Sequence, residues 1–197
     1  GELADQVIVE EVVRRALDFG LKPTHVDSHM GTVFTRPAYF QAYRKIAHEF
    51  KLPYLVPRLT PELMSELNPA VAAVSAFILA GAEKSGDIII DHLKTDIDAS
   101  PEKRTKAYID FIRDLKPGVT QVIVHCGEAS EELRAITSRW EARVADARAF
   151  TDPAVGKAIE DNGVVLIGWK ALKELRYGTE DAQPAAEPRP GGTVKVF

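Results

Sequence analysis

The stretch DIIIDHLKTDIDASPEKRTKAYIDFIRDLKPGVTQVIVH, residues 87–125, decides the fold class. It opens with an apolar run (87–93) that charged residues end, which is typical of a buried parallel strand. A helical pattern follows from Ser100 and Pro101 until Pro117-Gly118, and VTQVIVH is again a strand pattern. A strand, a helix and a strand in this order predict a βαβ unit with parallel strands.

The same alternation runs along most of the chain. Helical spacing of apolar residues predicts a first helix that Gly20 ends as a C-cap. Thr60 followed by Pro61 predicts the start of another helix, with threonine as the N-cap. Further strands are predicted at 23–29, 52–59 and 162–169, and further helices at 37–50, at 138–150 and after 151–153. The chain is therefore predicted to have an α/β fold.

The amino-acid composition indicates which classes of protein and of partner are to be expected. The 197 residues are 45% hydrophobic and 27% charged, with 25 basic and 29 acidic residues, which is ordinary for a globular domain. Basic residues do not interleave with aromatic ones, which argues against a nucleic-acid partner. The longest apolar tract, Pro69 to Ala82, is too short to cross a bilayer, so no membrane partner is expected. The single cysteine, Cys126, excludes an internal disulfide and fits the reducing cytoplasm.

Three predicted strands end in a histidine: His29, His92 and His125. In parallel α/β folds the chemistry gathers at the carboxyl ends of the strands. A single histidine at a strand end is commonly a hydrogen-bonded wall residue. Three histidines at the ends of parallel strands could converge on one site at the carboxyl edge of the sheet.

The motif THVDSH, residues 24–29, suggests one wall of a metal site. If it is extended, His25, Asp27 and His29 share a face. His25 and His29 would then lie about 13 Å apart, too far to hold one ion together, whereas Asp27 and His29 would be about 6.6 Å apart. We therefore expect Asp27 and His29 to act together and His25 to pack below them. A site needs a third ligand, which Asp91 or His92 could supply unless they are simply solvated residues at a strand end.

The segment around His125 offers acid–base chemistry. His125 ends an apolar strand, and could act as a general acid or as a donor to an oxyanion. Cys126 is expected to be a small buried residue rather than a nucleophile, since adjacent strand residues face opposite sides. Arg143 either forms a surface ion pair with Asp146 or reaches into the pocket to hold an acidic group.

Three quoted segments carry a resemblance: KPTHVDSHMG (22–31), GVTQVIVHCGEAS (118–130) and RWEARVADARAFTDPAVGKAIEDNGVVLIGW (139–169). Together they resemble the YdjC-like carbohydrate deacetylases, in order, over most of residues 1–177. The resemblance implies a distorted TIM-type (β/α) barrel and a divalent metal. Oxygen and imidazole ligands together permit Mg²⁺, which we expect first, and Zn²⁺ or Mn²⁺ as alternatives. It also implies a hydrolase that removes an N-acetyl group from a small carbohydrate.

The resemblance assigns roles to three residues. His29 matches a metal ligand, and Asp27 belongs to the same motif and would support catalysis there. His125 matches the active-site histidine of a His-Pro-Gly/Ala element, in which Cys126 here replaces the usual proline. Apart from the resemblance, we expect Arg143 to bind substrate if it reaches into the pocket.

Two elements of the family pattern have no counterpart in the sequence. These are an initial Ala-Asp-Asp-x-Gly strand and a Gly-x-His-x-x-Leu-Thr element that carries a second histidine ligand. We therefore expect residues 1–178 to be the C-terminal portion of a deacetylase-like barrel, incomplete at its N-terminus. Residues 179–197 are expected to form a flexible tail rich in Pro and Gly. Open sheet edges could then pair in a homodimer.

Two other functions stay open at this point. One is a non-catalytic sugar-binding homologue that has lost its metal. The other is a metal-dependent phosphoesterase on a related barrel, although the sequence has no Gly-rich phosphate loop.

Overall fold

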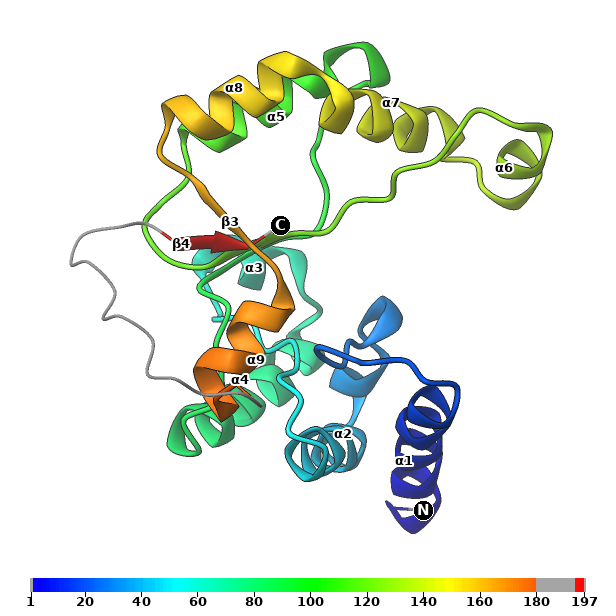
Figure 1. Ribbon diagram of the computed structural model, residues 1–197, viewed down its shortest axis with the longest axis vertical. Helices are drawn as coiled ribbons and strands as arrows, with labels where there is room; N and C mark the ends of the chain where they lie inside the picture. Colours follow the sequence, from blue (N-terminus) through cyan, green and yellow to red (C-terminus); the bar gives the residue numbers. More distant parts are fainter. Residues whose placement is uncertain (1, 180–193, 197) are drawn as a thin grey trace. The chain divides into compact units, whose positions relative to one another are not determined.

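The computed structural model describes residues 2–179 and 194–196 (Figure 1). The described chain divides into two compact units. The first contains residues 2–91 and 167–179, and the second contains residues 92–166 and 194–196. Each unit is described on its own below.

The first unit is mainly helical. Gly20, at φ 77°, follows helix α1 as predicted, and the Thr60 side chain accepts a hydrogen bond from the Leu63 amide at the start of α3. Its elements are α1 (Glu2–Asp18), the 3-10 helix η1 (His29–Thr35), α2 (Pro37–Glu49), α3 (Pro61–Glu66), α4 (Pro69–Lys84) and α9 (Trp169–Tyr177).

The strands predicted for this unit are reduced to single bridges. Val26 pairs in parallel with Tyr54, and Pro57 with Ile90. The predicted strand at 52–59 is therefore wrong in extent. Pro53 and Pro57 have no backbone N–H to donate, so a continuous ladder is interrupted in this segment.

Two apolar clusters form the core of the first unit. The larger lies between α2, α4 and the bridged segment, and the smaller joins α1 to α2. Their buried members are Phe40, Tyr43, Ala47, Tyr54, Val56, Ile78 and Ala82 in the larger cluster and Val13, Ile46 and Leu52 in the smaller.

The second unit contains the predicted βαβ arrangement. Strand β1 (His92–Lys94) pairs in parallel with β2 (Thr120–Val122), and α5 (Arg104–Arg113) connects them. The other elements are η2 (Pro101–Lys103), α6 (Glu131–Ile136), α7 (Trp140–Thr151), α8 (Pro153–Asp161), β3 (Val165–Ile167) and β4 (Val194–Val196), of which β3 pairs with β4. Apolar residues of α5 pack against α7 and α8.

The α/β class and the parallel strand pair are thus confirmed. Closure into a barrel stays a prediction, as do the domain boundaries at 1–178. Of the predicted flexible tail, residues 180–193 and 197 lie outside the described residues, while Val194–Val196 form β4. None of the described helices is both long enough and apolar enough to cross a membrane.

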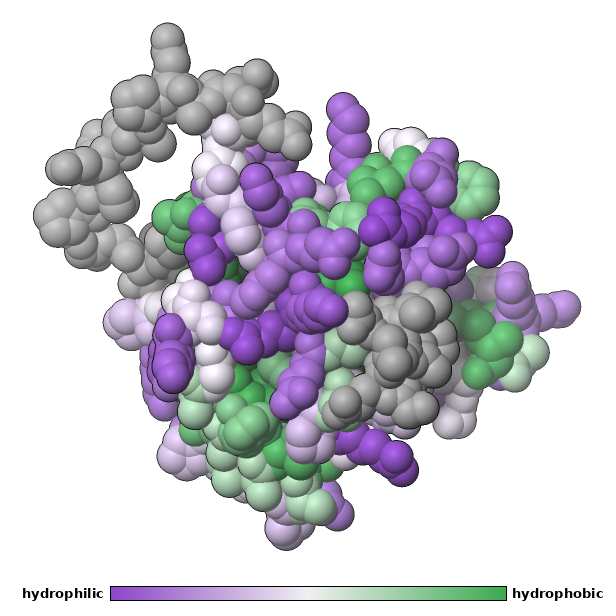
Figure 2. Space-filling model, turned by 90° about the horizontal axis from the view of Figure 1, so that it is seen from below, coloured by the Kyte–Doolittle hydropathy of each residue, from purple (hydrophilic) through white to green (hydrophobic). Residues whose placement is uncertain are grey.

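Apolar side chains are not all enclosed. Val12, Phe19 and Leu21, on α1 and the segment after it, are 64%, 78% and 61% exposed. Figure 2 shows, on the face that it presents, hydrophilic residues with an apolar patch among them.

Candidate functional site

The THVDSH motif is extended only as far as Ser28. The buried Ser28 accepts a hydrogen bond from the Val33 amide through Oγ, at 3.1 Å, and one from the Gly31 amide through its carbonyl, at 2.9 Å. Met30 and Gly31 have φ values of 56° and 68°, so the chain turns sharply. The predicted strand through residue 29 is therefore wrong in extent, because His29 begins the 3-10 helix η1.

Asp27 and His29 both reach the surface. Each side chain is exposed, while Ser28 between them points into the unit. The Val26 carbonyl just before them accepts a hydrogen bond from the Tyr43 hydroxyl, at 2.6 Å, which anchors the segment to α2. The motif thus presents a carboxylate and an imidazole on a short, fixed turn.

His25 packs against α9, in agreement with the expectation from its spacing. Its ring stacks on Trp169 with 4.7 Å between centroids and 3° between planes. Its Nδ1 lies 3.1 Å from the Thr24 hydroxyl, and Lys173 donates to the Pro23 carbonyl at 3.3 Å. His25 therefore joins the motif to the C-terminal helix of the first unit.

Burial lowers the pKa of His25, although the charge of Asp27 acts in the opposite direction. A lowered pKa in the folded state means that the neutral ring is favoured by folding. His25 should therefore contribute stability above about pH 6.5, the ordinary value, and this contribution should be lost as the pH falls through the folded-state pKa. An NMR titration should give a midpoint below 6.5 for His25, and Trp169→Ala should move it upward. A midpoint above 6.5 would contradict the packing.

The predicted convergence of three histidines is wrong for His92. Strand β1 begins at His92 instead of ending there, and His92 is opposite Thr120, the first residue of β2. The His92 ring contacts the Pro117 carbonyl, which precedes β2. His92 thus lies at the amino end of the strand pair, whereas His125 follows the carboxyl end of β2.

The His125 segment leaves the carboxyl edge of the β1–β2 pair. The Ile123 amide still donates to the Lys94 carbonyl at 2.8 Å, and the Gly127 amide donates to the Arg143 carbonyl of α7 at 3.1 Å. A Cβ on Gly127 would lie 3.0 Å from a Leu133 methyl, so the loop passes close to α6. His125 itself is exposed. Backbone contacts therefore hold the loop while leaving the imidazole accessible.

Arg143 does not pair with Asp146, so the surface ion-pair interpretation is wrong. Arg143 is half-buried, and no hydrogen bond or ion pair of its guanidinium is found within residues 2–179. Asp146 instead forms an ion pair with Arg104. Arg143 is therefore available to a ligand beside the His125 loop.

Cys126 is exposed, so its expected burial is wrong. Partial burial of the thiol raises its pKa, and the negative charge of Asp146 adds to this effect. A protonated thiol is a poor nucleophile, which agrees with the sequence argument against one.

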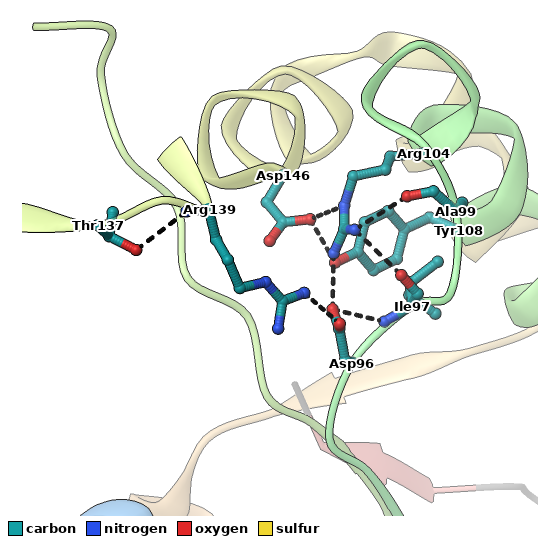
Figure 3. Close-up of polar contacts among 8 residues, drawn as sticks. All are labelled: Asp96, Ile97, Ala99, Arg104, Tyr108, Thr137, Arg139 and Asp146. Carbon is teal, nitrogen blue, oxygen red and sulfur yellow. Dashed lines mark hydrogen bonds and ion pairs between the residues drawn. The ribbon is translucent and has the colours of Figure 1, made fainter. Parts of the chain in front are cut away.

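A buried polar network, not foreseen from the sequence, joins α5 to α7 and to the segment after β1 (Figure 3). Arg104 and Asp146 are 2% and 3% exposed, and Nε of Arg104 donates to Asp146 Oδ1 at 2.6 Å. The Tyr108 hydroxyl donates to the same oxygen at 2.8 Å. Asp96 accepts from Arg104 at 2.8 Å and also pairs with Arg139.

The network balances its own charges. Burial acts to lower the pKa of Arg104, but hydrogen bonds to Asp96 and Asp146 outweigh it and raise the pKa. Burial acts to raise the pKa of Asp96, but hydrogen bonds from Arg139 and Arg104 outweigh it and lower the pKa. The Arg104 guanidinium and the Asp96 carboxylate are therefore held in their charged forms.

One sequence signal could have revealed this network. Arg104, Tyr108 and Ile112 are spaced four residues apart on α5, so they share one helix face. Tyr108 and Ile112 are core residues, and an arginine in line with them requires a buried partner.

The described residues do not complete a metal site. Among them, no three His, Cys, Asp or Glu side chains are grouped closely enough to hold an ion. Asp27 and His29 offer an exposed oxygen donor and an exposed nitrogen donor, so an ion bound here would need at least one further ligand.

Residues 10–161 match the family described as YdjC-like protein, which is more than half of the chain. The chain belongs to the YdjC-like family. A carbohydrate deacetylase from Thermoanaerobacter pseudethanolicus is 25% identical over 168 residues, which cover 85% of this chain and 59% of that protein. This YdjC-like chain thus spans less than two thirds of the length of that relative.

A solved structure has a similar fold. It belongs to a proposed cellobiose-phosphate cleavage protein from Enterococcus faecalis V583, with 15% identity and a TM-score of 0.58. The match covers 79% of this YdjC-like chain and 55% of that protein, and at such an identity it supports the fold alone. The family match includes Asp27, His29, His125 and Arg143.

Proposed function

We propose that this YdjC-like chain carries part of a carbohydrate deacetylase site, which hydrolyses the N-acetyl group of an amino sugar. The observation that supports it best is the family match over residues 10–161, together with a relative named carbohydrate deacetylase. We further propose a small carbohydrate as substrate and the cytoplasm as its location. A homodimer stays a prediction.

We assign separate roles in this reaction to three residues of the chain. His125, exposed at the carboxyl edge of β2, would donate the proton that the leaving amine requires. Arg143, half-buried and without a partner among the described residues, would bind an oxygen of the substrate. Asp27 would orient the imidazole of His29.

We also propose a divalent ion, Mg²⁺ first and Zn²⁺ or Mn²⁺ as alternatives, with His29 as one of its ligands. When bound, such an ion would polarise the acetamide carbonyl. The motif supplies His29 and the neighbouring Asp27. The remaining ligands of the ion would come from residues other than these two.

The test is release of acetate from N-acetylglucosamine oligomers by the intact protein, with and without a chelator. His29→Ala is expected to abolish release, because no other described side chain replaces it in the turn. Met30→Ala is the matched control, since Met30 is the next residue and is 90% exposed. Its activity should stay within about twofold of the parent.

The same samples separate the alternatives. Sugar binding without acetate release, unchanged by His29→Ala, would support a non-catalytic binding protein. Release of phosphate from a sugar phosphate would support the phosphoesterase. Acetate release that survives His29→Ala would contradict the proposed ligand.

A further inference from the structure

Arg104 is hydrogen-bonded to the segment after β1 and to helix α7 in the second unit. The segment after β1 (residues 95–99) and the segment after β2 (residues 123–128) leave the parallel pair at the same carboxyl edge. Helix α7 runs beside both, because Arg104 and Arg139 join it to the first segment and the Arg143 carbonyl joins it to the second. Figure 3 shows the Arg104 guanidinium between Asp146 of α7 and Asp96 of the segment after β1.

Each nitrogen of the Arg104 guanidinium donates hydrogen bonds to different acceptors. Nη1 donates to the carbonyls of Ile97 and Ala99, at 3.0 and 3.2 Å, and Nη2 donates to Asp96 at 2.8 Å. Nε donates to Asp146 at 2.6 Å. Four N–H donors of one planar group are thus used, and a lysine could not reproduce this fork.

The effect of Arg104 continues beyond its direct contacts. Asp146 lies one turn from Arg143 on α7, and the carbonyl of Arg143 accepts the Gly127 amide, at 3.1 Å. Gly127 is two residues from His125. Arg104 therefore fixes the helix that in turn fixes the His125 loop and carries Arg143.

We propose that Arg104 is a positioning residue for His125 and Arg143, acting through Asp146, α7 and the Gly127 amide. The inference rests on the proposed function for the roles of those two residues. The physical linkage can be tested without substrate.

The experiment compares the full chain with Arg104→Lys, which keeps the charge and loses the fork. Amide hydrogen exchange of Gly127 should become about tenfold faster, since one ammonium group cannot bond both Asp146 of α7 and residues 96–99 as the guanidinium does. The ring signals of His125 should shift in the NMR spectrum. Exchange of the Asn162 amide, at the end of α8 in the same unit, should change by less than about twofold, because its bond to the Ala158 carbonyl is local.

Arg113→Lys is the matched control, because Arg113 lies on α5 but is 63% exposed. It should leave Gly127 exchange and the His125 signals unchanged. If Gly127 exchanges no faster in Arg104→Lys, or if Gly127 and Asn162 accelerate equally, the proposal is overturned, since the second result would show only a general loss of stability.

A second variant decides the matter if Arg104→Lys does not fold. Tyr108→Phe removes only the hydroxyl that donates to Asp146 and keeps the ring in the core. Selective acceleration of Gly127 exchange by about threefold would support the proposal. No acceleration would overturn it. Neither readout uses a sugar, so a protein that releases no acetate would contradict the proposed function and leave the linkage intact.

Discussion

Replacing Arg104 with methionine is expected to lower the free energy of unfolding of the second unit by about 4 kcal/mol. Arg104 is 2% exposed and pairs with Asp146, which is 3% exposed. Methionine would fill much of the volume but leave the Asp146 carboxylate buried with the Tyr108 hydroxyl as its donor. An uncompensated buried charge costs more than the ion pair itself contributes.

Urea unfolding followed by tryptophan fluorescence measures the free energy of unfolding, and each unit contains one tryptophan as its reporter. Trp140 lies on α7 in the second unit, and Trp169 lies on α9 in the first. Fluorescence of Trp140 in a Trp169→Phe background therefore reports on the unit that contains Arg104. The midpoint should fall while the transition keeps its slope, as expected for a loss of stability alone.

A double-mutant cycle tests the cause. Arg104→Met combined with Asp146→Leu should be at least about 2 kcal/mol more stable than the sum of the two single changes predicts, because the double variant leaves no carboxylate unpaired at Asp146. Arg113→Met, at an exposed position of α5, should cost no more than about 0.5 kcal/mol. Strict additivity would show that the buried pair is not the source of the loss.

The sequence predicts well where local chemistry decides the structure. Asp152 precedes Pro153 and caps α8 by accepting from the Ala154 amide, and Thr60 caps α3 in the same way. The pattern in residues 87–125 gives a parallel strand pair joined by a helix. In each case a few neighbouring residues contain the whole signal.

Strand ends are harder to predict because they depend on the neighbouring segment. The apolar run at 87–93 looks like one strand, yet Ile90 pairs with Pro57 in one unit and His92 opens β1 in the other. A residue at the end of the sequence pattern thus becomes the first residue of a strand. This shift of position moves His92 to the edge opposite His125.

The site was predictable only in part for a similar reason. The motif around Asp27 and His29 is continuous in sequence, but the turn that exposes both residues depends on a hydrogen bond from Val33 to Ser28. The partners Arg104 and Asp146 are 42 residues apart. Spacing within one helix indicates that Arg104 faces the core, but it does not identify the carboxylate that meets it.

The first unit has its own buried charge, and Asp87→Asn is expected to destabilise it by about 3 kcal/mol. The Asp87 side chain is 3% exposed and accepts from the Tyr54 hydroxyl at 2.6 Å and from His48 at 2.8 Å. Arg44 lies at 3.3 Å and Arg176 of α9 at 3.7 Å. An amide keeps the shape but removes the anion. The loss is smaller than for Arg104, because these two arginines are 29% and 32% exposed and can turn partly to water.

Helix α9 should respond first to this change. Arg176 holds its C-terminal end through Asp87 and the Ser85 carbonyl, while Trp169 holds its N-terminal end by stacking on His25. In a Trp140→Phe background, Trp169 fluorescence of the Asp87→Asn variant should therefore shift to longer wavelength at a lower urea concentration than in the parent.

Glu83→Gln is the control for Asp87→Asn, because Glu83 is 49% exposed and pairs with Arg58 at the surface of the same unit. Exposed pairs contribute at most about 1 kcal/mol, so its unfolding midpoint should hardly move. Equal losses in the two variants would mean that burial of Asp87 adds nothing to the interaction. A large loss for Asp87→Asn with an unshifted Trp169 signal would instead place the stabilising effect in α2 and Tyr54.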